Sequence, residues 1–129
     1  MHASPQVAVL IETSTSWGID IIRGIRNYIA RHEPWLIHFE PRGRYEELQI
    51  PRGWKGDGVI ARVTSSRLAA QIARAGIPAV NVSWYDLGNA TIARCTSDEL
   101  CAGQLAAEYF LERGFRSFLS MIFFVESIR

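Results

Sequence analysis

The side chains with binding chemistry in this chain lie just after short runs of apolar, β-branched residues. They comprise two carboxylates, a guanidinium, a hydroxyl and two indoles: Glu12, Asp98, Arg62, Ser16, Trp17 and Trp84. Charged planar groups form paired hydrogen bonds with vicinal hydroxyls, and an aromatic face covers the apolar C–H side of a sugar ring. If the fold gathers them, these side chains predict a site for a polyhydroxylated ligand such as a sugar.

Each of these residues also has a purely structural explanation. Asp98 could favour the positive end of a helix, an effect worth about 0.3–1 kcal/mol. Arg62 could pair with Asp57 or another carboxylate, Glu12 could pair with an arginine, and Trp17 could pack at the start of a helix. A shared site is favoured because all of the candidates are expected at one edge of a sheet.

Strands and helices are predicted to alternate along the chain. The predicted strands cover residues 7–11, 35–39, 57–61 and 79–83, residues 91–95 read as a strand end, and a fifth strand is expected from near Phe115. The predicted helices cover residues 16–32 and about 65–75, and a third helix ends at Gly114. Residues 41–53 contain too many prolines and glycines for a long helix and are predicted to form a loop.

Helix ends are marked by local signals. Thr15 or Ser16 is expected to cap the first helix, Ser65 or Ser66 the second, and Gly76 to end the second in a left-handed conformation. Thr96 and Glu99 have the spacing of a capping box for the third helix. Leu100 and Phe110 are expected on the buried face of that helix.

This alternation predicts an α/β fold with a doubly wound parallel sheet, Rossmann-like and with a flavodoxin-type strand order. In such sheets, ligands bind beyond the carboxyl ends of the strands. The candidate residues follow successive strands and should converge there. Residues 1–129 are expected to form a single lobe.

Composition excludes several classes of protein. The chain has 129 residues, is 48% hydrophobic and carries a formal charge of +1. Its basic residues are dispersed, which argues against nucleic-acid or membrane binding by the chain itself. Its apolar runs are far shorter than the roughly 20 residues that span a bilayer. No secretory signal is recognisable, so a soluble, cytoplasmic protein is expected.

Enzyme signatures are missing from the sequence. Gly56-Asp-Gly58 precedes a strand, whereas a dinucleotide fingerprint follows one, and neither a Walker motif nor a nucleophile elbow is present. A phosphoaccepting receiver is disfavoured because single residues, Glu12 and Arg62, stand where it needs an acidic pair and an aspartate. We therefore expect no enzymatic activity, no catalytic residue, no cofactor and no metal, and Cys95 and Cys101 are expected to be ordinary thiols.

Several segments, in this order, resemble the amino-terminal lobe of a LacI/GalR-type effector-binding domain. They are Val7 to Arg31, Gly56-Asp-Gly-Val-Ile-Ala-Arg62, Gly76-Ile-Pro-Ala-Val-Asn-Val82, Thr96-Ser-Asp98, Leu105-Ala-Ala107 and Leu111-Glu-Arg-Gly-Phe-Arg116. The resemblance covers nearly all of residues 7–118. Within the family, Trp54-Lys-Gly-Asp-Gly-Val-Ile-Ala61 and the short stretch before the first strand look most like the xylose operon regulators, in which an AraC-type helix-turn-helix domain follows the sensing domain.

The resemblance implies a periplasmic-binding-protein-like fold and a cytoplasmic, sugar-responsive transcription regulator. The implied ligand is a pentose, with xylose expected, and Arg62 and Asp98 are implicated as its contacts, with Glu12, Ser16 and Trp17 beside them. DNA would be bound only through a domain absent from this chain, and a homodimer is compatible with the resemblance.

The last residues depart from the family pattern. From residue 119 to Arg129 the sequence no longer follows it, and the second lobe is absent, as expected of a truncated or frameshifted product or of a fragment. Half of a two-lobed cleft should bind sugar weakly. Two alternatives stay open: the lobe of a transport-associated sugar-binding protein, and a small enzyme acting on a sugar or phosphorylated substrate.

Overall fold

The computed structural model describes residues 3–87, 92–117 and 119 of the chain. The chain divides into two compact units, Met1–Thr96 and Ser97–Arg129. All of the described strands and two of the three described helices belong to the first unit.

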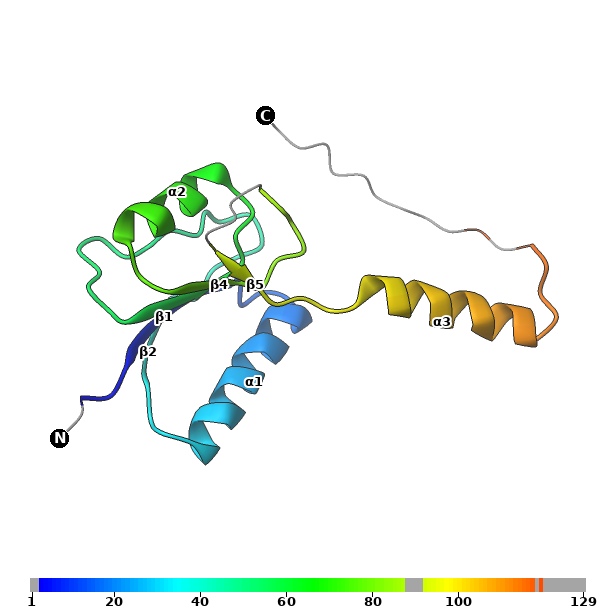
Figure 1. Cartoon of the computed structure of the whole chain (residues 1–129), viewed down its shortest axis with the longest axis horizontal. Coiled ribbons are helices and arrows are strands. Elements are labelled where there is room, and N and C mark those ends of the chain that lie inside the picture. The colour runs from blue at the N-terminus through cyan, green and yellow to red at the C-terminus, as the bar shows by residue number, and fades with distance from the viewer. Residues whose placement is uncertain (1–2, 88–91, 118, 120–129) are drawn as a thin grey trace. The chain divides into compact units, whose positions relative to one another are not determined.

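The first unit is a parallel sheet with helices between its strands (Figure 1). Its strands are β1 (Gln6–Leu10), β2 (Leu36–Phe39), β3 (Gly58–Ala61), β4 (Ala79–Asn81) and β5 (Ala93–Arg94), and its helices are α1 (Ser16–Arg31) and α2 (Ser66–Ala75). The five strands are all parallel and lie in the order β2-β1-β3-β4-β5. This confirms the predicted α/β class, the parallel sheet and the flavodoxin-type strand order.

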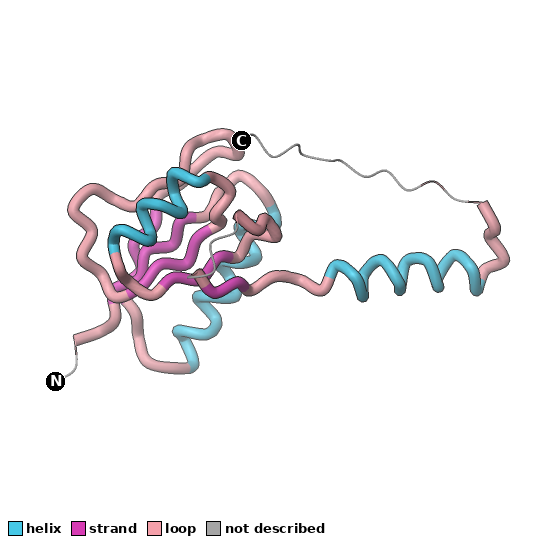
Figure 2. The backbone as a smooth tube through the Cα atoms, turned by 45° about the horizontal axis from the view of Figure 1, so that its top comes forward, coloured by secondary structure: helices cyan, strands magenta, loops and turns pink. Residues whose placement is uncertain are grey.

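The residues of β1 alternate between two hydrophobic clusters, because successive side chains of a strand point to opposite faces. Val7 and Val9 pack with Ile22 of α1, whereas Ala8 and Leu10 pack with residues of α2 such as Leu68. The two helices therefore cover opposite faces of the sheet (Figure 2). Burial of side chains of this size contributes about 1.5–3 kcal/mol each, so the two clusters fix how β1 sits in the sheet.

Local capping signals are confirmed in this unit. The Thr15 hydroxyl accepts a hydrogen bond from the Gly18 amide at 3.1 Å, and the Ser65 hydroxyl accepts one from the Leu68 amide at 3.2 Å. Gly76 follows α2 with φ of 65°, the left-handed conformation that was predicted. These contacts satisfy amides that a helix end otherwise leaves unpaired.

A long loop joins β2 to β3, as predicted from its prolines and glycines. Arg67 of α2 donates to both carboxylate oxygens of Glu47 at 2.9 Å, and the Ile50 amide donates to Gln71 Oε1 at 3.1 Å. Leu48 of the same loop is buried against the α2 face of the sheet. The loop is thereby fastened to α2.

Strand β2 forms one edge of the sheet, and within the described residues it pairs only with β1. It has four residues, and prolines stand close to both of its ends, at Pro34 and Pro41. The Leu36 amide, at the start of the strand, donates to the Pro5 carbonyl at 2.8 Å. At the opposite edge, β5 has only two residues.

The prediction of a fifth strand near Phe115 was wrong for the described residues. Residues 115–117 form no strand, and residue 118 and residues 120–129 lie outside the described part. The fifth strand is instead β5, with Ala93 opposite Val80 and Arg94 opposite Asn81. On the side away from β3, β4 thus pairs with β5, a segment that the sequence predicted only as the end of a strand.

The second unit contains one described helix, α3 (Glu99–Glu112). Its N-cap is Asp98, whose Oδ1 accepts a hydrogen bond from the Cys101 amide at 2.9 Å. The prediction that Thr96 and Glu99 form a capping box was therefore wrong. Gly114 follows the helix with φ of 80°, as expected for its end. None of the α3 side chains is buried, and Leu100 and Phe110, which were predicted on a buried face, are 75% and 40% exposed.

Candidate functional site

The turn between β1 and α1 brings helix and strand unusually close together. A Cβ atom on Gly18 would lie 1.9 Å from the backbone oxygen of Glu12 and 3.3 Å from Cγ2 of Ile11. Only glycine tolerates this approach. The close contact fixes the first turn of α1, and with it Trp17, beside the carboxyl end of β1.

Glu12 and Arg62 form an ion pair at the ends of the two central strands. Arg62 Nη1 donates to Glu12 Oε1 at 2.6 Å, and the Arg62 amide donates to the Leu10 carbonyl at 3.0 Å. The Glu12 side chain is 7% exposed and that of Arg62 27%. A carboxylate this deeply buried needs a charged partner, so the pair holds the guanidinium in place at the sheet edge.

Trp17 contributes an aromatic surface next to this pair. The Arg62 guanidinium carbon lies 5.8 Å from the centroid of the indole ring, which is a cation–π distance. Trp17 is 39% exposed, so part of the ring remains open to solvent. Glu12, Arg62 and Trp17 therefore come together, as the sequence predicted for the carboxyl edge.

No described contact joins Ser16 or Trp84, the two other predicted site residues of the first unit, to this group. Ser16 is exposed at the first position of α1. Trp84, after β4, is exposed and stacks on Tyr85 with ring centroids 4.3 Å apart. Asp98 belongs to the second unit and caps α3 there, so its proximity to Arg62 stays a prediction.

Asn81, at the carboxyl end of β4, is a polar residue that the sequence reasoning missed. It is buried, and its Oδ1 accepts from the amides of Val63 at 3.0 Å and Ser83 at 2.8 Å, while Nδ2 donates to the Tyr85 carbonyl at 3.3 Å. Its side chain thus ties the ends of β3 and β4 to the chain that follows. An asparagine within an apolar strand was the available signal, since buried polar groups are almost always hydrogen-bonded.

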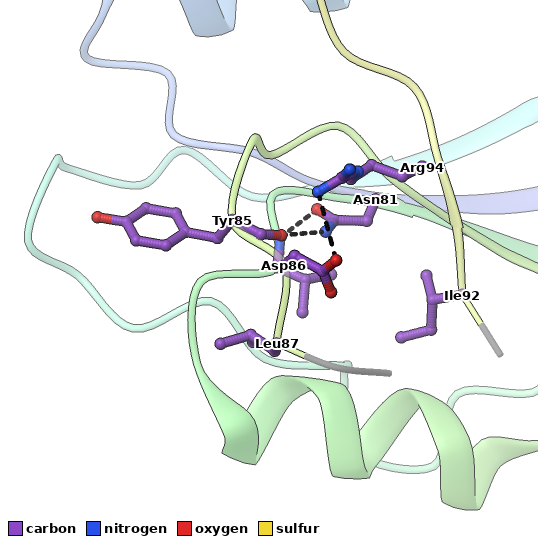
Figure 3. Close-up of a pocket in the computed structure, with 7 residues that line it drawn as sticks. Asn81, Tyr85, Asp86, Leu87, Ile92 and Arg94 are labelled. Atoms are coloured by element: carbon purple, nitrogen blue, oxygen red, sulfur yellow. Dashed lines mark hydrogen bonds and ion pairs between the residues drawn. The ribbon is translucent and has the colours of Figure 1, made fainter. Parts of the chain in front are cut away.

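A small pocket opens beside Asn81, at the carboxyl ends of β3, β4 and β5 (Figure 3). Its volume is about 170 Å³. The described residues that line it are Val63, Asn81, Tyr85, Asp86, Leu87, Ile92 and Arg94. Val63 immediately follows Arg62, so the pocket and the ion pair lie on consecutive residues of one strand end.

The histidines and cysteines do not gather at this edge as a reactive group. His32 contacts the Tyr28 carbonyl through Nδ1 at 2.8 Å, and His38 packs against Trp54, whereas His2 lies outside the described residues. The two cysteines are exposed free thiols. In the part of the chain that the structure describes, no three histidine, cysteine, aspartate or glutamate residues are grouped to hold a metal ion.

Over the described residues, no helix combines the length and the apolar character needed to cross a bilayer. The chain matches no family model, no curated protein and no solved structure. The geometry of the carboxyl edge is therefore the main basis for assigning a function.

Proposed function

We propose that this chain is a ligand-binding lobe for a polyhydroxylated small molecule, with a pentose such as xylose as the expected ligand. The observation that carries the proposal is the guanidinium of Arg62, held between Glu12 and the Trp17 ring at the carboxyl edge of the sheet. Ligands of open parallel sheets bind at this edge.

Arg62 has more N–H donors than its ion pair with Glu12 uses. A guanidinium carries five N–H donors in a planar fork. Among the described residues of the first unit, the only side-chain oxygen that Arg62 reaches is Glu12 Oε1, through Nη1. The remaining donors match two neighbouring hydroxyl oxygens of a sugar, because the fork spaces them for bidentate contacts.

Trp17 supplies the apolar half of such a site. The exposed part of its ring can cover the C–H face of a sugar, while the ion pair keeps the adjacent guanidinium from moving. Small-molecule sites typically combine the two in this way, with apolar surfaces around a few well-placed polar groups. The proposal therefore needs both residues.

Titration of the full chain with D-xylose, followed by two-dimensional amide NMR, tests the proposal. We expect saturable shifts at residues 12–18 and 60–63, and weaker or no shifts with L-xylose, because a fixed fork distinguishes enantiomers. Arg62→Lys preserves the charge beside Glu12 but removes the fork, and Trp17→Leu preserves apolar bulk but removes the ring. Each should weaken binding by about tenfold or more.

Arg74→Ala is the matched control. Arg74 is exposed in the last turn of α2, at the opposite end of that helix from the sheet's carboxyl edge, so this variant should bind as the parent does. Equal affinity of all three variants for D-xylose, or equal shifts with the two enantiomers, would exclude Arg62 and Trp17 as the sugar site.

We further propose that sugar binding serves transcription regulation. The support is the order of sequence segments that resemble LacI/GalR-type sensing domains, the xylose operon regulators in particular, together with the parallel sheet of matching class. Deleting the gene and measuring transcripts of pentose-utilisation genes with and without xylose tests this. A transport-associated binding protein would leave those transcripts unchanged while xylose uptake falls, and that result would refute regulation.

A further inference from the structure

The pocket beside Asn81 has hydrogen-bond donors on one side and apolar walls on the other (Figure 3). Asn81 and Arg94 present nitrogen atoms to it, whereas Leu87 and Ile92 lie on its other side. Val63, which is almost fully buried, forms part of the lining. The pocket lies in the first unit and includes neither Arg62 nor Trp17.

Asn81 retains one unused donor. Its carboxamide oxygen accepts from two backbone amides, which occupies both of its lone pairs, and this fixes which way the amide group faces. Its nitrogen has two hydrogens, and within the described residues one of them is used, by the Tyr85 carbonyl. The second N–H belongs to a buried side chain that lines the pocket, and a ligand acceptor would satisfy it.

Arg94 is held much more loosely than Arg62. Its Nη1 lies 3.4 Å from the Trp84 carbonyl and 3.9 Å from Asp86 Oδ2, compared with 2.6 Å between Arg62 and Glu12. The Arg94 side chain is 45% exposed and that of Asp86 is 74% exposed, so both remain solvated. A contact this long between exposed groups contributes little, and a better acceptor can replace it.

The size of the pocket suits a small ligand. At about 170 Å³ it is smaller than the roughly 300–1,000 Å³ of typical drug-sized sites. It is close to the roughly 150 Å³ of an engineered cavity that holds benzene, a molecule of six heavy atoms. An acceptor group of two or three atoms with a short hydrocarbon part fits this volume.

We propose that this pocket binds a short aliphatic carboxylate, with the carboxylate on Arg94 and the Asn81 amide and the hydrocarbon part against Val63, Leu87 and Ile92. The guanidinium fork matches a carboxylate in two parallel hydrogen bonds, which are about twice as strong as neutral ones. Asp86 also lines the pocket, but its side chain is 74% exposed, so water screens its charge when Arg94 turns to the ligand. This site is separate from the proposed sugar site and takes a different class of ligand.

Titration of the full chain with sodium butyrate, followed by amide NMR, tests the proposal, with butyramide as the uncharged probe of the same size. We expect saturable shifts at Val63, Asn81 and Ile92 with butyrate and at least tenfold weaker binding of butyramide. Arg94→Gln should weaken butyrate binding by about tenfold or more, and Arg94→Lys, which keeps the charge without the fork, by less. Arg74→Ala should change nothing.

Asp86→Asn separates a carboxylate ligand from a hydroxylated one. Removing this negative charge should tighten butyrate binding, because the ligand no longer competes with Asp86 for Arg94. A polyol would instead exchange a charged acceptor for a weaker neutral one and bind more weakly. Absence of butyrate shifts at tens of millimolar, equal binding of butyramide, or weaker butyrate binding by Asp86→Asn would each overturn the proposal, and none of them affects the xylose test at Trp17 and Arg62.

Discussion

The guanidinium of Arg62 lies 2.6 Å from the carboxylate of Glu12, although the two residues are 50 positions apart in the sequence. Each follows a central strand of the sheet, β1 for Glu12 and β3 for Arg62, and the pairing of these strands brings them together. The ion pair is thus a direct product of the strand order. It also places the best candidate for ligand binding at the centre of the carboxyl edge.

Arg62→Ala is expected to destabilise the chain by about 3 kcal/mol, because the buried carboxylate of Glu12 would lose its charged partner. Urea unfolding monitored by tryptophan fluorescence measures the change. Replacing both residues by leucine should cost much less than Arg62→Ala alone, since no charge is left buried. Arg23→Ala breaks an exposed pair with Asp20 and should cost less than about 0.5 kcal/mol. Equal losses for Arg62→Ala and Arg23→Ala would contradict the structural role of the buried pair.

Gly18→Ala is expected to destabilise the chain by more than about 2 kcal/mol. The added Cβ would meet the Glu12 carbonyl at 1.9 Å, so the first turn of α1 must move away from β1. Gly24→Ala in the same helix is the matched control, because nothing lies within 4 Å of its added Cβ. That control should stabilise the helix by roughly 0.5–1 kcal/mol. Thermal unfolding of the two variants side by side gives the answer, and a stabilising Gly18→Ala would disprove the close approach.

Asn81→Leu is expected to cost about 2–4 kcal/mol, because it leaves the amides of Val63 and Ser83 buried without an acceptor. Asn81→Asp retains the acceptor oxygens and loses the donor to Tyr85, so these two amides should remain protected in it. Hydrogen exchange of Val63 and Ser83 followed by NMR distinguishes the variants. Unchanged exchange of both amides in Asn81→Leu would show that the side chain is not their partner.

Asp98→Ala is expected to loosen the first turn of α3 by about 1 kcal/mol, since the Cys101 amide loses its acceptor. Asp98→Asn should preserve the turn, because asparagine caps helices about as well as aspartate. Amide exchange at Cys101 reports on both. Only Asp98→Asn then tests the ligand role predicted for Asp98, because this variant removes the charge and keeps the cap. Loss of xylose binding in this variant would support the ligand role. Unchanged xylose binding would leave Asp98 with a capping role alone.

Features encoded by neighbouring residues were predictable from the sequence. Thr15, Ser65 and Gly76 act through hydrogen bonds or backbone angles within one helical turn, so residue type limited each N-cap to two neighbouring residues and identified Gly76 directly. The cap of α3 was harder to predict, because Thr96, Ser97 and Asp98 are all good caps. The choice depends on where the backbone enters the helix, which residue type does not reveal.

Features that join distant segments were predicted only in outline. The convergence of Glu12, Trp17 and Arg62 followed from the rule that parallel strands end at one edge, but the identity of the ion pair did not. Asn81 and Arg94 were missed because their role depends on β5 lying beside β4, and the sequence showed only a strand end there. The predicted meeting of Asp98 with Arg62 remains a prediction.

The prolines near β2 bear on how this protein behaves at high concentration. An exposed edge strand presents unpaired amides and carbonyls on which another chain can add a strand, which is how many sheets begin to aggregate. With Pro34 and Pro41 near its ends, β2 cannot lengthen by more than a few residues, since a proline offers no amide for strand pairing. The outer edge of the sheet is consequently too short to serve as an effective template for fibril growth.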